Sequence, residues 1–123
     1  MNTKLINHRK ELIRKYKRTP KVMGVYLIRN TKNGKCYVAS SIDIRSRINR
    51  HKMDLKTNSE HVLALQDDWN RFGADTFEFE MVDTLKPLDD AGYDPKEDLA
   101  ELEQLWLEKL QPYGNKGYNT KKE

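Results

Sequence analysis

The chain has 123 residues, of which 37% are hydrophobic and 34% charged, and its net charge at pH 7 is +4. A chain of this length is expected to form one domain with a modest core. It has no apolar run near the ~20 residues needed to cross a bilayer and no secretory signal core, and its single cysteine, Cys36, excludes a disulfide framework and a cysteine-built zinc site.

The charge is distributed unevenly along the chain. Residues 1–52 hold 15 Lys or Arg against two acids, a net of +13, whereas residues 53–123 hold eight against 17, a net of −9. Such separation favours an electropositive face for a polyanion such as nucleic acid. The alternative is a solvated basic helix that pairs with an acidic one, and charge alone does not choose between them.

Residues 1–22 are a basic extension with eight bases and one acid. A broken apolar stripe predicts a helix over residues 3–18, which ends before Pro20. This helix could dock on the domain or lie along a phosphate backbone. Its candidate contacts to nucleic acid are Lys10, Arg14 and Lys17.

A β-hairpin is predicted at residues 23–30 and 35–39, where β-branched and aromatic residues favour strands. An Asn-Gly pair between the two runs is the strongest short turn signal in the chain. Strand alternation places Tyr26 and Ile28 on one face of the first strand and Leu27 on the other.

Two helices are predicted next. The first covers residues 43–56, with Asp43 as a cap. In this helix Arg47 and His51 stand one turn apart beside the apolar stripe, so they point to the same flank. The second covers residues 60–72 and has a regular amphipathic pattern.

The acidic half contributes one more strand and one more helix. Residues 76–82 alternate between apolar and acidic side chains, which predicts a strand. Residues 86–96 are expected to form a loop because they hold two prolines and a glycine. A final helix is predicted over residues 97–110, followed by a tail without regular structure.

Glu103 is the most informative acid in the chain. On a helical wheel it lies about 40° from Leu99 and about 60° from Trp106, within the apolar stripe of its helix. A carboxylate that faces the core costs free energy unless it is paired or binds a cation. Glu103 could therefore pair with an arginine such as Arg47, reach water at the edge of the stripe, or bind a metal ion.

Several candidate residues suit phosphodiester chemistry together. Considered alone, Tyr26 and Tyr37 would be packing residues of a hairpin, and Arg47 and His51 would be surface residues of a basic helix. Phosphodiester cleavage requires cations that neutralise the phosphate, a proton acceptor and a metal ion at the leaving oxygen. The convergence of these four residues with Glu103 therefore indicates a catalytic site.

The order of short sequence motifs along the chain resembles that of the GIY-YIG nuclease family. The resemblance covers residues 24–119, and what it implies is an α/β (α+β) sandwich in which helices flank a three-stranded antiparallel sheet. Five ordered blocks carry it: GVY at 24–26 with YVAS at 37–40, RSRINRH at 45–51, LALQDDWNRFG at 63–73, FEFEMV followed by LEQLW, and GYN at 117–119.

The resemblance implies an endodeoxyribonuclease that hydrolyses double-stranded DNA by in-line attack of water, with Mg²⁺ or Mn²⁺ as cofactor. By position, Tyr26 corresponds to the tyrosine that deprotonates the water, and Tyr37 to the one that orients water or phosphate. Arg47 corresponds to the arginine that stabilises charge on the phosphate.

The remaining site residues follow from the same resemblance. Glu103 corresponds to the protein ligand of the metal ion and Asn119 to an asparagine that braces the site. His51 corresponds to a histidine of the basic helix, and His61 is a softer match to a second histidine. On the basic helix we expect DNA contacts from Arg45, Arg50 and Lys52.

The clearest departure from the family pattern is Ala39, where the family usually has glycine. It keeps open a second hypothesis, a weak or inactive module that binds nucleic acid on the nuclease fold. A protein-interaction domain with an acidic binding face is a third hypothesis, without a motif behind it. The blocks look most like the phage and homing branch, so we expect either a free-standing nuclease or the catalytic part of a longer protein, in the cytoplasm of a prokaryote or a phage-infected cell.

Overall fold

The computed structural model describes residues 21–88 and 90–121. Its three strands form an antiparallel sheet in the order β2-β1-β3, which confirms the predicted fold class. In chain order the elements are β1 (Met23–Asn30), β2 (Cys36–Ser41), α2 (Ile44–Lys56), α3 (Leu63–Phe72), β3 (Phe77–Leu85) and α4 (Lys96–Leu110), with 3-10 turns at Ala74–Thr76 and Gly114–Lys116.

The described residues include neither the predicted N-terminal helix nor a helix suited to crossing a membrane. The helix predicted over residues 3–18, with Lys10, Arg14 and Lys17, lies outside the described residues. Within the described ranges, no helix combines the length and the apolarity that a membrane crossing requires.

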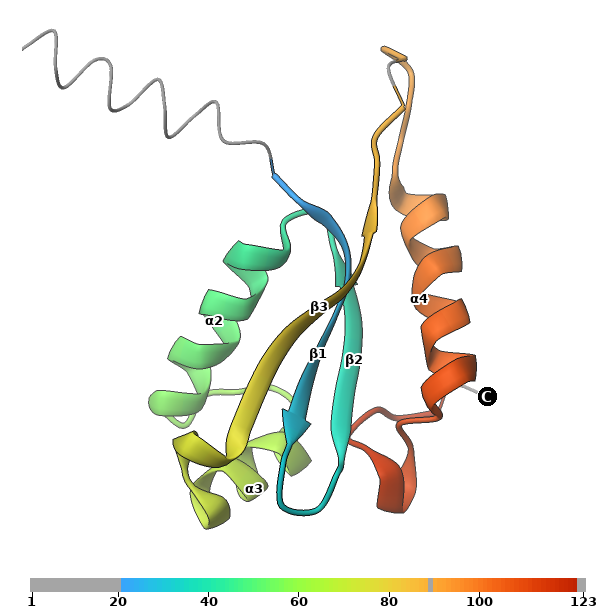
Figure 1. Ribbon diagram of the computed structural model, residues 1–123. Coiled ribbons are helices and arrows are strands. Elements are labelled where there is room, and N and C mark those ends of the chain that lie inside the picture. Colours follow the sequence, from blue (N-terminus) through green and yellow to red (C-terminus); the bar gives the residue numbers. More distant parts are fainter. Residues whose placement is uncertain (1–20, 89, 122–123) are drawn as a thin grey trace, which may run out of the picture.

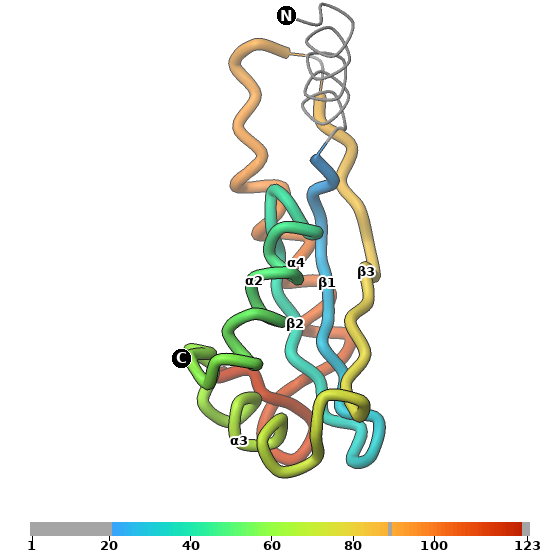
Figure 2. Tube along the Cα trace, turned by 90° about the vertical axis from the view of Figure 1, so that its left-hand side faces the viewer, coloured from blue at the N-terminus to red at the C-terminus, as the bar shows by residue number. Residues whose placement is uncertain are grey.

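β1 is the central strand and is covered on both faces. Figure 1 shows α4 on one side of the sheet and α2 and α3 on the other, and Figure 2 shows the strands side by side with β1 in the middle. Leu27 packs with Leu102 and Trp106 of α4, whereas Tyr26 and Ile28 join clusters on the side of α2 and α3. The alternation predicted for this strand is therefore confirmed.

β3 continues to Leu85, beyond the end at residue 82 that alternation predicts. The reason is an irregularity opposite β1, where one extra residue, Val82, enters the strand between the partners of Val25 and Tyr26. Because such a bulge turns two successive residues toward the same side, Val82 packs against α4 and Asp83 accepts a hydrogen bond from the Trp106 indole at 2.9 Å.

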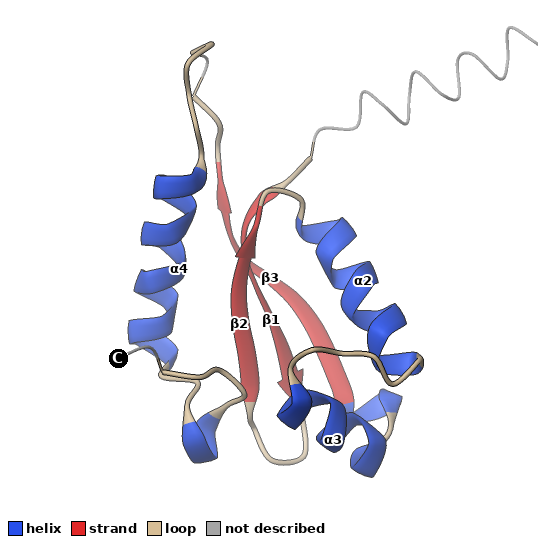
Figure 3. Ribbon diagram, turned by 180° about the vertical axis from the view of Figure 1, so that it is seen from behind, coloured by secondary structure: helices blue, strands red, loops and turns tan. Residues whose placement is uncertain are grey.

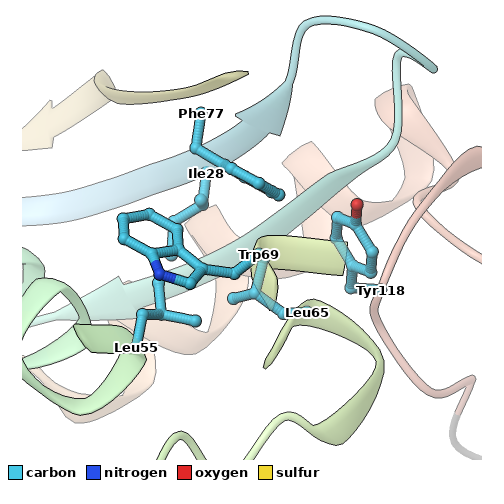
Figure 4. Close-up of a cluster of buried hydrophobic side chains, with 6 residues drawn as sticks. All are labelled: Ile28, Leu55, Leu65, Trp69, Phe77 and Tyr118. Carbon is cyan, nitrogen blue, oxygen red and sulfur yellow. The ribbon is translucent and has the colours of Figure 1, made fainter. Parts of the chain in front are cut away.

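The largest core cluster lies between the sheet, α2 and α3 (Figure 4). Its buried members are Ile28, Leu55, Leu65, Trp69, Phe77 and Tyr118. The Tyr118 hydroxyl donates to Asp68 Oδ2 at 2.6 Å and accepts from Asn30 Nδ2 at 3.1 Å. The segment after α4 is thus anchored in the core by a side chain.

The same segment runs along the open edge of β2, as Figure 3 shows from behind. Gly117 forms an isolated parallel bridge with Cys36, and the Tyr118 N–H donates to the Cys36 carbonyl at 2.9 Å. The prediction of a tail without regular structure is wrong, because the tail contains the 3-10 turn at Gly114–Lys116 and isolated β-bridges, which with the side-chain contacts give it a defined path.

Gly24 is required by its backbone surroundings. Its φ is +153°, and a Cβ at this position would collide with the carbonyl oxygen of Asp83. We expect Gly24→Ala to lower the free energy of unfolding by roughly 2–4 kcal/mol, from backbone strain and overpacking. Urea denaturation followed by circular dichroism measures this, with Gly92→Ala as control because the nearest atom lies 3.9 Å from its Cβ. Equal midpoints for the two variants would contradict the expectation.

Candidate active site

The centre of the candidate site is a buried hydrogen bond between β1 and α2. The Tyr26 hydroxyl lies 2.8 Å from His51 Nε2, and the two residues are 1% and 2% exposed. α2 places the imidazole there because Asp43 caps the helix, accepting from the Ser46 N–H at 3.3 Å, and Leu55 anchors it in the core. Both predicted residues thus meet inside the protein.

Two further aromatic rings surround His51. The Tyr37 ring meets it edge-on, with centroids 5.7 Å apart, and the His61 ring stacks on it at 6.1 Å. Tyr37 is half-buried on β2, whereas the His61 side chain is 61% exposed. His61, the softer match, therefore lies next to His51 on the solvent side of the candidate site.

Arg47 and His51 line one cavity of about 650 Å³ beside α2. Arg47 itself is exposed, so its guanidinium is available to an anion. The prediction that these two residues point to the same flank is confirmed. Tyr26 is not among the residues that line this cavity, but its hydroxyl bonds to His51, which lines it.

A second cavity of about 720 Å³ opens at the edge of β2. It brings together Tyr37, His61, Glu103 and Asn119, which come from β2, a loop, α4 and the tail. Because His61 lines both cavities, the two are neighbours. Residues that are remote in the sequence therefore line two neighbouring cavities.

Glu103 projects from α4 toward β2 rather than toward Arg47. Its Oε1 accepts a hydrogen bond from the Ser40 N–H at 3.0 Å, and within the described ranges it forms no ion pair. One oxygen is thus held by the sheet while the carboxylate lines the second cavity. Of the three options for Glu103, a pair with Arg47 or another described arginine is therefore excluded.

The donor set around Glu103 suits one kind of metal ion. Among the described residues there is no group of three or more His, Cys, Asp or Glu side chains that could hold a metal. Mg²⁺ is commonly bound by one or two carboxylates together with waters and substrate phosphates. A single held carboxylate at a cavity therefore fits Mg²⁺ in the presence of a phosphate ligand, and it does not fit a closed structural site.

Asn119 clamps the backbone of β2. Its Oδ1 accepts from the Val38 N–H at 2.8 Å and its Nδ2 donates to the Val38 carbonyl at 2.7 Å. Val38 lies directly after Tyr37, so the tail fixes the strand that carries this tyrosine. Asn119 contacts no other site residue through these bonds.

Burial dominates the electrostatics of both tyrosines. It raises the pKa of Tyr26 well above its usual value, Tyr37 adds to the rise, and Arg47 opposes it through hydrogen bonding and charge. Burial also raises the pKa of Tyr37, where Arg47 lowers it and the charges of Glu60 and Glu103 raise it. Neither tyrosine is thus prepared to ionise by losing its proton to bulk water.

Ala39 is accommodated without strain. It is not among the described non-glycine residues with positive φ, which are Asn58 and Gln111. Its methyl group packs in a cluster with Tyr26 and Ile44. The backbone at this position therefore does not require glycine.

The basic residues predicted on α2 are at the surface. Arg45, Arg50 and Lys52 are exposed, and Arg50 pairs with Asp54 at 3.2 Å. The Lys52 ammonium lies 4.9 Å from the centre of the Phe79 ring. These side chains supply positive charge on the helix that carries Arg47.

Glu60 is a site residue that sequence analysis missed. Its side chain is fully buried, with Oε2 2.8 Å from His51 Nδ1 and Oε1 3.1 Å from His61 Nδ1. The predicted helix start at residue 60 is also wrong, because α3 begins at Leu63. The only signal was an acid beside His61; loops have no periodicity from which burial could be inferred.

The chain is similar in sequence to known proteins. The family model described as "GIY-YIG catalytic domain" matches residues 22–119. The intron-associated endonuclease 1 of Enterobacteria phage T4 is 34% identical over 96 residues, which are 78% of this chain and 36% of that protein. The chain thus spans about a third of the length of this relative.

Solved structures show the same fold. The catalytic domain of homing endonuclease I-TevI matches with a TM-score of 0.64 and 31% identity, over 81% of this chain and 99% of that chain. A mutant of the I-TevI catalytic domain matches with a TM-score of 0.65 and 30% identity, over 80% and 92% of the two chains. Sequence and fold agree, and the chain belongs to the GIY-YIG family of catalytic domains.

Proposed function

We propose that this protein is an endonuclease that hydrolyses phosphodiester bonds of double-stranded DNA with a divalent metal ion, in the cytoplasm of a prokaryote or a phage-infected cell. The observation that carries the proposal is the Tyr26–His51 hydrogen bond beside an exposed Arg47, next to a cavity with Glu103. The relatives named above are endonucleases, which supports the same reaction class.

Arg47 would bind and neutralise the scissile phosphate. Its guanidinium is exposed at the first cavity and forms no ion pair within the described ranges. Preorganised positive charge stabilises the charge that develops on a phosphate in the transition state. Tyr37, at the border of the second cavity, would orient the phosphate or the attacking water.

Tyr26 would act as the base with His51 as the final proton acceptor. Because burial disfavours a lone tyrosinate, the hydroxyl proton has to move to a neighbour as the water proton arrives. His51 Nε2 is 2.8 Å away and can accept it. The Tyr26 hydroxyl would give its proton to His51 Nε2 and take one from the attacking water, so Tyr26 ends neutral. Solvent would protonate the leaving oxygen.

Glu103 would hold the metal ion, and Asn119 would keep β2 in place beside it. Bound Mg²⁺ or Mn²⁺ would supply positive charge for the phosphate and its leaving oxygen. Glu103 is suited to this because its second oxygen is not engaged by Ser40. Asn119 would act through the Val38 backbone, not on the substrate.

The first test is cleavage of supercoiled plasmid with Mg²⁺. We expect wild type to nick the plasmid, and Glu103→Gln and Arg47→Ala each to be slower by about 10²-fold or more, because each removes charge stabilisation of the transition state. Glu108→Gln is the matched control, since Glu108 is exposed on the same helix.

The outcomes separate the two functional hypotheses. Equal nicking by wild type and the two site variants would contradict the assigned roles. Wild-type protein that binds DNA but shows no metal-dependent nicking would favour the inactive binding module. Unchanged fold in every variant is checked by circular dichroism.

A second test concerns the basic face of α2. We expect Arg45→Ala and Arg50→Ala to weaken DNA binding about equally on all sequences and to reduce the slope of log K against log salt by about 0.9 each, the value for one lost phosphate contact. Binding is measured by fluorescence anisotropy without divalent metal. Lys96→Ala, exposed at the start of α4, is the control, and an unchanged slope for the α2 variants would place the DNA elsewhere.

A further inference from the structure

We propose that Glu60 is a positioning residue of this site: its carboxylate holds His51 in the tautomer whose Nε2 is bare and can accept the proton of Tyr26. The inference rests on the proposed nuclease function for its catalytic consequence. Its structural part, the tautomer of His51, is measurable without any cleavage assay.

The burial of Glu60 is the first argument. It lies in the short loop between α2 and α3, where a carboxylate would ordinarily reach water, yet its side chain is 0% exposed. Burying a carboxylate costs free energy unless strong partners compensate. Its partners are the two histidines of the site, with Oε2 at 2.8 Å from His51 Nδ1.

The two hydrogen bonds of His51 determine its proton positions together. A carboxylate can only accept, so Nδ1 carries the proton toward Glu60. In the neutral ring Nε2 is then an acceptor, and the Tyr26 hydroxyl, 2.8 Å away, must donate to it. These hydrogen bonds allow a proton to move from the Tyr26 hydroxyl to His51 Nε2. The Glu60 carboxylate then stabilises the imidazolium that forms.

Glu60 is held by the two helices that flank its loop. Its N–H donates to Gln66 Oε1 at 3.1 Å, and Gln66 Nε2 donates to the Leu55 carbonyl at 3.0 Å. The Val62 N–H, just before α3, contacts Oε1 at 3.4 Å, where the positive end of the helix favours an anion. The carboxylate therefore has a fixed position, as a group that orients another must have.

The second oxygen links the buried pair to the cavities. Oε1 lies 3.1 Å from Nδ1 of His61, and His61 lines both cavities. Glu60 thus also holds the exposed imidazole at the border between the Arg47 cavity and the Glu103 cavity.

A merely structural ion pair would look different at the atomic level. It would contain a doubly protonated His51, whose Nε2 could only donate to Tyr26 and could not take its proton. The protonation of Nε2 therefore separates a positioning role from a structural one.

The first experiment reads this protonation directly. The chain has three histidines, so full-length protein labelled with ¹⁵N-histidine gives three sets of ring signals, and His51→Gln identifies one of them. At pH 7.5 we expect the His51 ring to be neutral, with a proton on Nδ1 and none on Nε2. A proton on Nε2, in either the other tautomer or the imidazolium, would overturn the proposal.

The second experiment measures the catalytic consequence. We expect Glu60→Gln to lower the single-turnover rate of plasmid cleavage by about 10²–10⁴-fold, the range for general-base catalysis and for loss of a carboxylate that orients histidine. Glu80→Gln removes the same charge from an ion pair with Arg29 on β3 and should stay within about twofold of wild type.

The outcomes are distinguishable. Folded Glu60→Gln that cleaves at the wild-type rate, beside active wild type, would overturn the proposal while leaving the nuclease function intact. If wild type does not cleave at all, the nuclease function fails, and the tautomer measurement still decides the placement of the proton. If Glu60→Gln does not fold, the wild-type ring spectrum is the deciding measurement.

Discussion

Any polar group that points inward from β1 has to find its partner inside the protein, because helices cover both faces of this strand. Two such groups are Tyr26, near the middle of the strand, and Asn30 at its end. Tyr26 is satisfied by His51, and Asn30 is satisfied by Tyr118 and by the backbone of the hairpin turn. In the described part of the chain no buried side-chain nitrogen or oxygen lacks a partner. The buried polar chain at the site is therefore a consequence of the same packing that builds the core.

The edge of β2 that faces away from β1 leaves its backbone groups without a strand partner. β1 pairs with only one side of this strand, so backbone groups on its other side remain available. Glu103 takes the Ser40 N–H, Asn119 takes both backbone groups of Val38, and Gly117 bridges to Cys36. Elements from the last quarter of the chain are brought beside Tyr37 in this way. The edge thus joins the acidic half of the protein to the basic half that carries Arg47.

Much of this arrangement could be predicted from local patterns. The hairpin, the amphipathic helices and the division of β1 between two faces follow from periods of two and about 3.6 residues, which a short window reveals. The inward direction of Glu103 follows from its place in the helical stripe. The end of β3 was placed too early because the bulge at Val82 breaks alternation, and a window that assumes strict alternation cannot see it.

The sequence by itself determined the order of elements and the family, and it indicated six side chains as candidate site residues: Tyr26, Tyr37, Arg47, His51, Glu103 and Asn119. Only the tertiary structure decided which of them touch. Glu103 meets Ser40 instead of an arginine, Tyr26 is enclosed behind His51, and Glu60 is buried in a loop that looks exposed. The physical reason is that periodicity reports the direction of a side chain within its own element, whereas partners and burial in loops depend on contacts between elements far apart in the chain.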